Sequence, residues 1–386
     1  MDFALSAEQE MFRDLFHDFV EKEVAPLAEQ IDQEEKLPDS LLQKAAAQGF
    51  LGATLPEEYG GAGLDYSTYA LLAEAVGREC LSLAAALGIH TMLSAMTLLD
   101  GGSPAQREAF LPRLAGGQLG TFALTEPEAG SDPGALQTRA AREDGHYRLN
   151  GVKSWVSNGG QAGLHVIIAR TGPGERHHGL SAFVVEPDTP GLSLGQREPT
   201  LGMRGLDIRT AYLEDCRVPV DHRLGEEGDG WRLVLRAFDR VRLSLAAAAL
   251  GAAEGALALG VKFAVERRQF GMPIGQKQAI QGYVADCAVE VEALRHLVQY
   301  TAWLADTGQP FGRHASMAKY LGARVARDTA NKMLQVHGGY GFSEEYAIAR
   351  YYRDVRALRL LGGTDEIQRY AVARGVFDKH GLTIQP

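Results

Sequence analysis

The segment that decides the fold is Arg353–Arg369, which reads R-D-V-R-A-L-R-L-L-G-G-T-D-E-I-Q-R. At its centre two adjacent glycines precede a threonine. Six further short blocks come before it: L-P-E-E-Y-G-G-A-G (55–63), T-E-P-E-A-G-S-D (125–132), W-V-S-N-G-G (155–160), E-R-R-Q-F-G (266–271), Q-A-I (278–280) and Q-V-H-G-G-Y-G-F (335–342). Any one block could arise by chance. Seven in this order, along nearly the whole chain, leave little room for another fold.

In this order the blocks resemble those of the acyl-CoA dehydrogenase family. The last segment is similar to that family's C-terminal active-site motif, in which a glutamate followed by Gly-Thr abstracts the substrate's α-proton. Gly362 stands in the place of that glutamate. Long-chain and isovaleryl-type members carry the base instead in an E-R-L triplet on an earlier helix, and the matching triplet here is Val241-Arg242-Leu243. The resemblance implies that both catalytic positions, Gly362 and Val241, lack a carboxylate, and that Gly362 offers only its backbone N–H.

Composition describes an ordinary globular protein with more than one domain. The 386 residues exceed the size at which a single core usually stops growing. With 45% hydrophobic and 23% charged residues, the chain is neither disordered nor membrane-spanning. The net charge of −10 argues against nucleic-acid binding, which needs a basic surface.

Cys80, Cys216 and Cys287 are widely separated along the chain. They match no metal-ligand spacing and no disulfide framework. We therefore expect buried, reduced cysteines, a cytoplasmic protein and no metal site.

A helical first domain is predicted over residues 1–118. Met1–Gln9 lacks the basic and apolar regions of a targeting sequence. Ser6 and Gln9 instead predict a capping box, ahead of apolar residues at helical spacing.

A β domain is predicted over residues 119–230. Asp144-Gly145 and Asn150-Gly151 have the composition of hairpin turns. Short apolar runs separated by glycine-rich turns continue to about Gly230, which is typical of an antiparallel, barrel-like sheet.

A helical domain is predicted over residues 231–386. Gly338 follows His337 where a helix C-cap is expected. The resemblance implies the same mainly α architecture, with an N-terminal helical domain, a central β domain and a C-terminal four-helix bundle. The runs long enough for a bundle are 231–265, 279–305 and 313–336.

No G-x-G-x-x-G fingerprint follows a strand and opens a helix, which disfavours a Rossmann nicotinamide enzyme. The family binds FAD by another route, so the resemblance implies FAD as cofactor. Apolar side chains and an indole would wall the flavin, while backbone amides and hydroxyls would meet its polar edge. Considered alone, Trp155 would more often be a core aromatic of a strand. The positions that match the isoalloxazine and ribityl contacts are Phe122, Ala123, Leu124, Thr125, Ser131, Trp155, Val156 and Ser157.

The family takes its FAD diphosphate and adenine contacts largely from a neighbouring subunit. Arginine suits a diphosphate because its planar fork donates two parallel hydrogen bonds, and glycine lets the backbone approach closely. The resemblance therefore implies a homotetramer whose isolated monomer would have an incomplete cofactor site. The matching positions are Arg267, Arg268, Gln269, Gln278, Gln335, Val336, His337, Gly338 and Gly339. The resemblance also implies that Thr364 and Glu366 of the last segment bind the cofactor.

The resemblance also implies contacts with the acyl-CoA substrate from Ser131, Asp239, Arg242 and Gly363. Asp239 and Arg242 are one helical turn apart and share a face. An ion pair without a ligand role is an equal alternative for them, because such pairs are common and weak. His90 resembles a position beside the acyl tail, where a lone histidine is more often a packing residue than a base.

The activity that the resemblance implies is α,β-desaturation of an acyl-CoA thioester, with hydride transfer to FAD N5 and an electron-transferring flavoprotein as acceptor. Removal of the Cα proton needs a base, whose loss typically costs on the order of 100- to 10,000-fold in rate. The N–H of Gly362 could still stabilise the thioester oxyanion.

Three hypotheses follow. In the first, the base comes from another position, with Asp239, His90 and Glu366 as candidates. In the second, the protein is a flavoenzyme with altered chemistry, such as a reductase, a nitroalkane-oxidase-like enzyme or an enzyme of carrier-protein thioesters. In the third, it is a non-enzymatic flavin or acyl-CoA binding protein.

Overall fold

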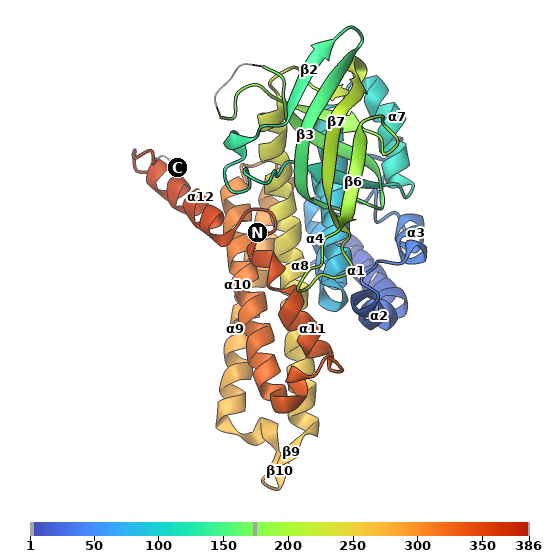
Figure 1. Ribbon diagram of the computed structural model, residues 1–386. Coiled ribbons are helices and arrows are strands. Elements are labelled where there is room, and N and C mark those ends of the chain that lie inside the picture. The colour runs from blue at the N-terminus through green and yellow to red at the C-terminus, as the bar shows by residue number, and fades with distance from the viewer. Residues whose placement is uncertain (1–3, 173–175, 385–386) are drawn as a thin grey trace.

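The computed structural model describes residues 4–172 and 176–384, and it consists of a helical part, a β part and a long helical bundle (Figure 1). The expected capping box is present: Ser6 Oγ accepts from the N–H of Gln9, and Gln9 Oε1 accepts from the N–H of Ser6. Met1–Gln9 is predicted not to be a targeting sequence, and the first three residues of this segment lie outside the described residues.

The first part is helical, as predicted. Its helices α5 and α6 are joined by a fully buried π-helical segment, Ile89–Ala95, which packs against α8 and the first strand. The helices of this part are α1 (Ala7–Phe19), α2 (Ala28–Gln33), α3 (Asp39–Ala47), α4 (Tyr66–Glu79), α5 (Leu81–Gly88), α6 (Met96–Gly101) and α7 (Pro104–Ala115).

The central part is a mostly antiparallel sheet in the order β6-β7-β3-β2-β4-β5-β8. Strand β1 pairs in parallel with β4, and β2 meets β4 in parallel at one residue pair. Some buried strand side chains pack against the helices and belong to the main hydrophobic core. Others form a smaller separate core among the strands themselves. The strands are β1 (Leu119–Ala123), β2 (Arg139–Glu143), β3 (His146–Ser157), β4 (Ala162–Arg170), β5 (Leu180–Val185), β6 (Leu192–Arg197), β7 (Ile208–Pro219) and β8 (Arg223–Leu224).

One of the two predicted hairpin turns is confirmed and the other is wrong. Asp144-Gly145 joins β2 to β3, and Gly145 has φ +76°. Asn150-Gly151 lies inside β3, where the pairing with β7 is irregular. A Cβ on Gly151 would lie 2.4 Å from Oγ1 of Thr138, the residue before β2, so this glycine allows a close approach of backbone and does not form a turn.

The last part is a bundle of long helices, with a small β9–β10 hairpin at its far end and α12 extending away from it (Figure 1). Gly338 caps α10 with φ +60°, as expected. The elements are α8 (Gly230–Glu266), β9 (Arg268–Gln269), β10 (Met272–Pro273), α9 (Gln278–Asp306), α10 (Gly312–His337), α11 (Ala347–Asp354) and α12 (Asp365–Asp378).

Helix α8 is the common partner of the two helical parts. Small residues allow its backbone to approach α4 very closely: a Cβ on Gly77 would lie 2.4 Å from the carbonyl oxygen of Ala248, and one on Gly251 would lie 1.9 Å from that of Glu74. Such contacts admit no side chain, so these glycines fix the distance between the helices.

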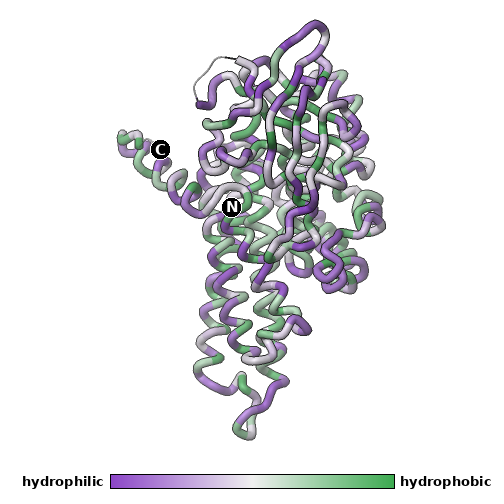
Figure 2. The backbone as a smooth tube through the Cα atoms, viewed as in Figure 1, coloured by the Kyte–Doolittle hydropathy of each residue, from purple (hydrophilic) through white to green (hydrophobic). Residues whose placement is uncertain are grey.

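Two segments are long and apolar enough to cross a membrane by length and composition, namely Leu81–Gly101 and α8. Their most apolar windows are 94% and 72% buried inside the fold, so they are core helices here. Figure 2 shows hydrophilic residues along the outer loops and strand edges and hydrophobic stretches inside. Cys80, Cys216 and Cys287 are buried, and none is in a disulfide.

Two buried histidines make the fold sensitive to acid. His90 and His165 are both fully buried, and burial lowers the pKa of each to about 4. In the unfolded chain these histidines bind protons near pH 6.5, whereas in the folded protein they do so only near pH 4. Their contribution to the free energy of unfolding is therefore fully present above pH 6.5 and is lost as the pH falls towards 4. We expect the free energy of unfolding in urea to fall by several kcal/mol between pH 7 and pH 4.5.

The variant His165→Leu should lose less stability over that range, since it has no proton to bind there. The matched change at the exposed His178, His178→Leu, should leave the native pH dependence in place. Equal pH dependence in native protein and His165→Leu would contradict the assignment.

Candidate active site and cofactor pocket

The glycine pair Gly362-Gly363 lies directly before α12 and turns with left-handed backbone, φ +71° and +96°. Thr364 follows as the N-cap of α12 and accepts from the N–H of Ile367. A Cβ on Gly363 would lie 2.7 Å from Nε2 of Gln368, so only glycine fits there without a shift. No described residue accepts a hydrogen bond from the N–H of Gly362.

One face of α8 meets this glycine pair. Arg242 donates from Nε to the carbonyl of Gly362 at 3.2 Å and from Nη1 to Asp239 Oδ1 at 3.4 Å. Its guanidinium lies 5.6 Å from the ring centre of Phe238, which in turn packs edge-on against Phe122 of β1 at 6.4 Å. Asp239 and Arg242, the expected substrate residues of α8, are thus connected through Phe238 to Phe122, an expected flavin residue.

The three candidate bases differ sharply in their surroundings. His90 accepts from the N–H of Gly120 at Nδ1 (2.8 Å) and donates from Nε2 to the carbonyl of Leu51 (3.1 Å), so it has no free lone pair and is a packing residue. Glu366 is exposed on α12. Burial raises the pKa of the half-buried Asp239 despite Arg242 beside it, which leaves Asp239 as the candidate next to the glycine pair.

The two positions at which the sequence predicts a missing base, 241 and 362, are not equivalent. Val241 is 1% exposed and belongs to the apolar core. Gly362 is partly exposed, and a Cβ on it would lie 2.8 Å from Cδ1 of Leu245, the mobile end of a side chain. A carboxyl group at 241 would therefore be buried, while one at 362 would begin from a strained backbone.

The expected flavin residues of the β part lie on two adjoining segments. The N–H of Ser154 donates to the carbonyl of Thr125 at 2.8 Å, which joins β3 to the end of β1. Ala123 and Val156 turn their side chains into the sheet core, so only their backbone groups remain for a ligand. Ser131 is exposed in the following loop.

A buried ion pair braces this junction from behind. Lys153, which is fully buried, donates to the carbonyl of Leu124 at 3.2 Å and to Glu126 Oε1 at 2.7 Å. Glu126 also accepts from the backbone N–H groups of Gln137 and Thr138. Burial lowers the pKa of Lys153 to about 8. These partners hold the backbone at Leu124 in place.

Trp155 is not a core aromatic of the strand. It is 62% exposed and has φ +58°, at an irregularity of β3. A bulky residue in the left-handed region is strained, and such strain is typical of functional sites. The exposed indole is available to a flat ligand.

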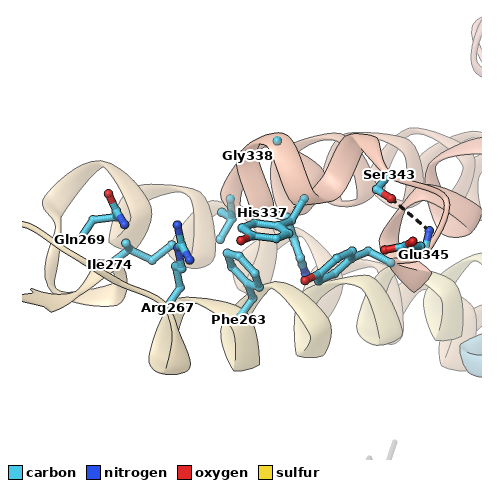
Figure 3. A pocket seen from close by; sticks show the side chains of 12 residues that line it. Phe263, Arg267, Gln269, Ile274, His337, Gly338, Ser343 and Glu345 are labelled. Carbon is cyan, nitrogen blue, oxygen red and sulfur yellow. Dashed lines mark hydrogen bonds between the residues drawn. The ribbon is translucent and has the colours of Figure 1, made fainter.

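A second group of expected cofactor residues lines a pocket of about 680 Å³ between the ends of α8 and α10 (Figure 3). Phe263 stacks on His337 with ring centres 4.4 Å apart, and the guanidinium of Arg267 lies 5.2 Å from the ring centre of Tyr340. The backbone turns away at Gly338 and Gly339, where a Cβ would meet nothing within 4 Å. A cation, aromatic rings and open glycine backbone are suitable for a nucleotide diphosphate.

Not every expected residue takes part in this pocket. Arg267, Gln269, Val336, His337, Gly338 and Gly339 line it, whereas Arg268, Gln278 and Gln335 do not. The pocket begins at Phe263, about 21 residues along α8 from Arg242, which is roughly 30 Å at 1.5 Å per residue. One chain therefore carries the two halves of the expected cofactor site at separate places.

Comparison with known proteins identifies the chain. Models of the acyl-CoA dehydrogenase N-terminal, middle and C-terminal domains match residues 6–118, 121–216 and 228–377. The chain belongs to the acyl-CoA dehydrogenase family. It is therefore an FAD-dependent oxidoreductase that acts on the CH–CH group of an acyl-CoA thioester.

Three similar proteins cover almost the whole chain. An acryloyl-CoA reductase (NADH) of Anaerotignum propionicum is 42% identical over 98% of this chain and 97% of its own. A chain solved in work on the electron-transferring flavoprotein of Acidaminococcus fermentans is 37% identical with a TM-score of 0.96, over 97% of this chain and 99% of that one. Butyryl-CoA dehydrogenase of Megasphaera elsdenii is 36% identical with a TM-score of 0.95, over 98% and 100%.

Four residues that contact the expected site segments were not identified from the sequence. Lys153 and Glu126 form the brace behind the flavin segments, and Lys319 and Gln368 donate to the glycine pair. Lys319 offered a signal, since it is a lone lysine on the apolar face of α10. Glu126 and Gln368 lie inside recognised blocks, but their partners are distant in sequence.

Replacing Lys153 should destabilise the fold strongly. Lys153→Met leaves the carboxylate of Glu126 buried without its countercharge, and loss of one partner of a buried pair costs roughly 3–5 kcal/mol. We expect that decrease in the free energy of unfolding at pH 7. The double variant Lys153→Met with Glu126→Gln should recover part of it.

The control is Lys332→Met, because Lys332 pairs with Asp286 at 3.0 Å on the surface of the bundle. It should change the free energy of unfolding by less than about 1 kcal/mol. Equal losses in the two lysine variants would show that the buried pair is not special.

Proposed function

We propose that this protein binds an acyl-CoA thioester between the glycine pair and the flavin segments, with the N–H of Gly362 as donor to the thioester carbonyl. The observation that carries the proposal is Gly362 itself. It has no side chain, its carbonyl is held by Arg242, and its N–H is left to a ligand. Oxyanion stabilisation by such a fixed donor typically contributes a factor of about 100 to 1,000.

The cofactor site would be shared between two copies of the chain. The isoalloxazine and ribityl parts would lie at Phe122–Thr125, Ser131 and Trp155–Ser157, and FAD bound there accepts the hydride from Cβ. The diphosphate and adenine would contact Arg267, Gln269 and His337–Gly339 of another copy, with Arg268, Gln278 and Gln335 on neighbouring segments. Thr364 and Glu366 lie instead beside the glycine pair, at the start of α12. The separation of the two groups along α8 supports this division.

We propose a homotetramer in the cytoplasm, with an electron-transferring flavoprotein as electron acceptor. Exposed apolar side chains near the end of the bundle support association, since Val265, Phe270 and Phe342 are 65%, 88% and 90% exposed. The buried, unpaired cysteines fit a reducing compartment. The similar chain solved in work on an electron-transferring flavoprotein supports that partner.

Asp239 is the carboxylate that we propose as proton acceptor in place of the family glutamate. It shares Arg242 with Gly362, and burial raises its pKa. A base works best when its pKa approaches the working pH. The ion pair with Arg242 opposes this, so proton removal should be slow.

Reduction of an enoyl-CoA is the second candidate. The 42% identity to an acryloyl-CoA reductase over nearly the whole chain favours it. The chain's own residues would act alike in both directions, because the Gly362 N–H would stabilise the same enolate oxygen.

Loss of Arg267 should weaken FAD binding without unfolding the protein. We expect the native protein to be a yellow tetramer with one FAD per chain, measured by size-exclusion chromatography with absorbance at flavin wavelengths. Arg267→Ala should lower occupancy at least tenfold at limiting FAD, because a charge-assisted hydrogen bond contributes about 1.5–3 kcal/mol.

Arg324→Ala is the matched control, since Arg324 lies on the surface of α10 and lines no part of the pocket. Its FAD content should equal that of the native protein. A colourless native monomer, even with added FAD, would remove the basis of the shared site.

Restoring a carboxylate should raise the rate of desaturation. Anaerobic single-turnover reduction of the flavin by a series of acyl-CoAs should be slow in the native protein. Val241→Glu should be faster by about 100- to 10,000-fold, because a buried carboxyl has a raised pKa and suits general-base work. Gly362→Glu should gain less, because φ +71° strains a side chain by about 1–3 kcal/mol.

Asp239→Asn serves as the companion variant and should reduce the native rate at least tenfold. If the flavin is bleached only by electron donors of another chemical class, the protein is a flavoenzyme with altered chemistry. If acyl-CoA binds tightly but bleaches the flavin in no variant, the protein is a non-enzymatic binder. Native rates of about 1 to 1,000 per second, unchanged by either glutamate, would show that a full base already exists elsewhere.

A further inference from the structure

The glycine pair has no side chain to hold it, so its position must come from outside. Glycine has the widest choice of backbone conformations and loses the most conformational freedom on folding. Two adjacent glycines at φ +71° and +96° would therefore spread over many conformations on their own. A donor N–H stabilises an oxyanion only where it is fixed in advance.

Side chains from three helices hold the two carbonyls of the pair. Arg242 of α8 donates to the carbonyl of Gly362 at 3.2 Å. Lys319 of α10 donates from Nζ to the carbonyl of Gly363 at 2.6 Å. Gln368 of α12 donates from Nε2 to both carbonyls, at 3.2 and 3.1 Å. Each peptide plane of the pair is thus tied to the bundle.

The contact from Lys319 is the shortest of these hydrogen bonds, and its side chain is almost completely buried, with 1% exposed. The groups that face it are Asp365, whose Oδ1 lies 3.8 Å from Nζ and whose other oxygen accepts from Arg359, together with Arg242 and Glu366. The nearest carboxylate is beyond hydrogen-bond distance, so the Gly363 carbonyl is the one acceptor that the described residues offer Lys319.

Burying this ammonium is costly. Burial lowers the pKa of Lys319 to about 8, with Arg242 and Arg359 acting in the same direction and Asp365 against it. A methionine of similar shape would avoid the cost of burying a charge. What methionine lacks is a charged donor for the Gly363 carbonyl.

We infer that Lys319 is a positioning residue of the active site: its ammonium holds the Gly363 carbonyl against α10 and thereby fixes the turn that presents the N–H of Gly362. The inference deepens the proposed function and rests on it, because it assigns the N–H to the thioester carbonyl. A trans peptide keeps its C=O and the following N–H in one plane. The Gly362 carbonyl shares a plane with the N–H of Gly363, and the Gly363 carbonyl shares one with the N–H of Thr364. Holding both carbonyls fixes the two peptide planes that directly follow Gly362, which leaves the Cα of Gly362 little freedom to rotate and so limits where its own N–H points.

The first test needs no ligand. Amide hydrogen exchange over residues 360–366 should be at least tenfold faster in Lys319→Met than in the native holoenzyme, and Lys319→Arg should restore most of the protection. Lys332→Met, on the surface of the same helix, is the matched control and should exchange like the native protein. Native exchange in Lys319→Met would overturn the inference.

The second test separates positioning from general stability. Calorimetric titration compares acetoacetyl-CoA, which has the thioester carbonyl, with S-butyl-CoA, a thioether without it. Lys319→Met should weaken binding of acetoacetyl-CoA about tenfold or more, since the N–H that meets its thioester carbonyl is no longer fixed in advance. Binding of S-butyl-CoA should stay within about twofold.

Equal losses for both ligands would reduce Lys319 to a structural role and overturn the inference. If Lys319→Met does not fold, Gln368→Met, which removes the donor shared by both carbonyls, should give the same selective loss. Native protein that binds neither ligand would contradict the proposed function, while the exchange measurement would still decide whether Lys319 holds the turn.

Discussion

The rest of the structure depends on the close backbone contact of α8 with its neighbours. A Cβ on Gly77 or Gly251 would enter the facing backbone of α8 or α4, and one on Gly260 would lie 2.2 Å from the sulfur of Met333 of α10. Because α8 is held on both sides, the residues along it have fixed positions. Its first half supplies Arg242 to the glycine pair, and its C-terminal end supplies Phe263 to the pocket between α8 and α10.

The glycine pair is held by donors from α8, α10 and α12, although neither position 241 nor position 362, where the sequence predicts the family's base, carries a carboxylate. In the proposed site, binding of a thioester carbonyl and proton removal would therefore be separable. Binding would depend on a backbone N–H that any residue except proline would provide at 362, whereas proton removal would need a side chain that glycine does not have.

Two buried lysines donate hydrogen bonds to main-chain carbonyls in segments that are not part of a helix or a strand. Lys153 and Glu126 brace the junction of the flavin segments, and Lys319 anchors the turn before α12. Each lysine costs free energy to bury, as its lowered pKa indicates. In both cases the charged group donates to a main-chain carbonyl of a segment assigned to ligand binding.

The ordered sequence blocks indicated the family through their resemblance to it. Local periodicity predicted the helical and β parts and the bounds of α8, α9 and α10 to within a residue or two, because a helical period of 3.6 residues is visible in neighbouring positions. The sequence also identified the vacancies at Gly362 and Val241. It failed at Asn150-Gly151, where a turn-like dipeptide lies inside β3, because only the facing strands decide between a turn and an irregular pairing. Tertiary structure decided that His90 is a packing residue and that Trp155 is exposed. It also brought Lys319 and Arg242, 44 and 120 residues from their acceptors, to the glycine pair. Contacts over such separations are set by how helices pack, and no spacing within the sequence encodes them.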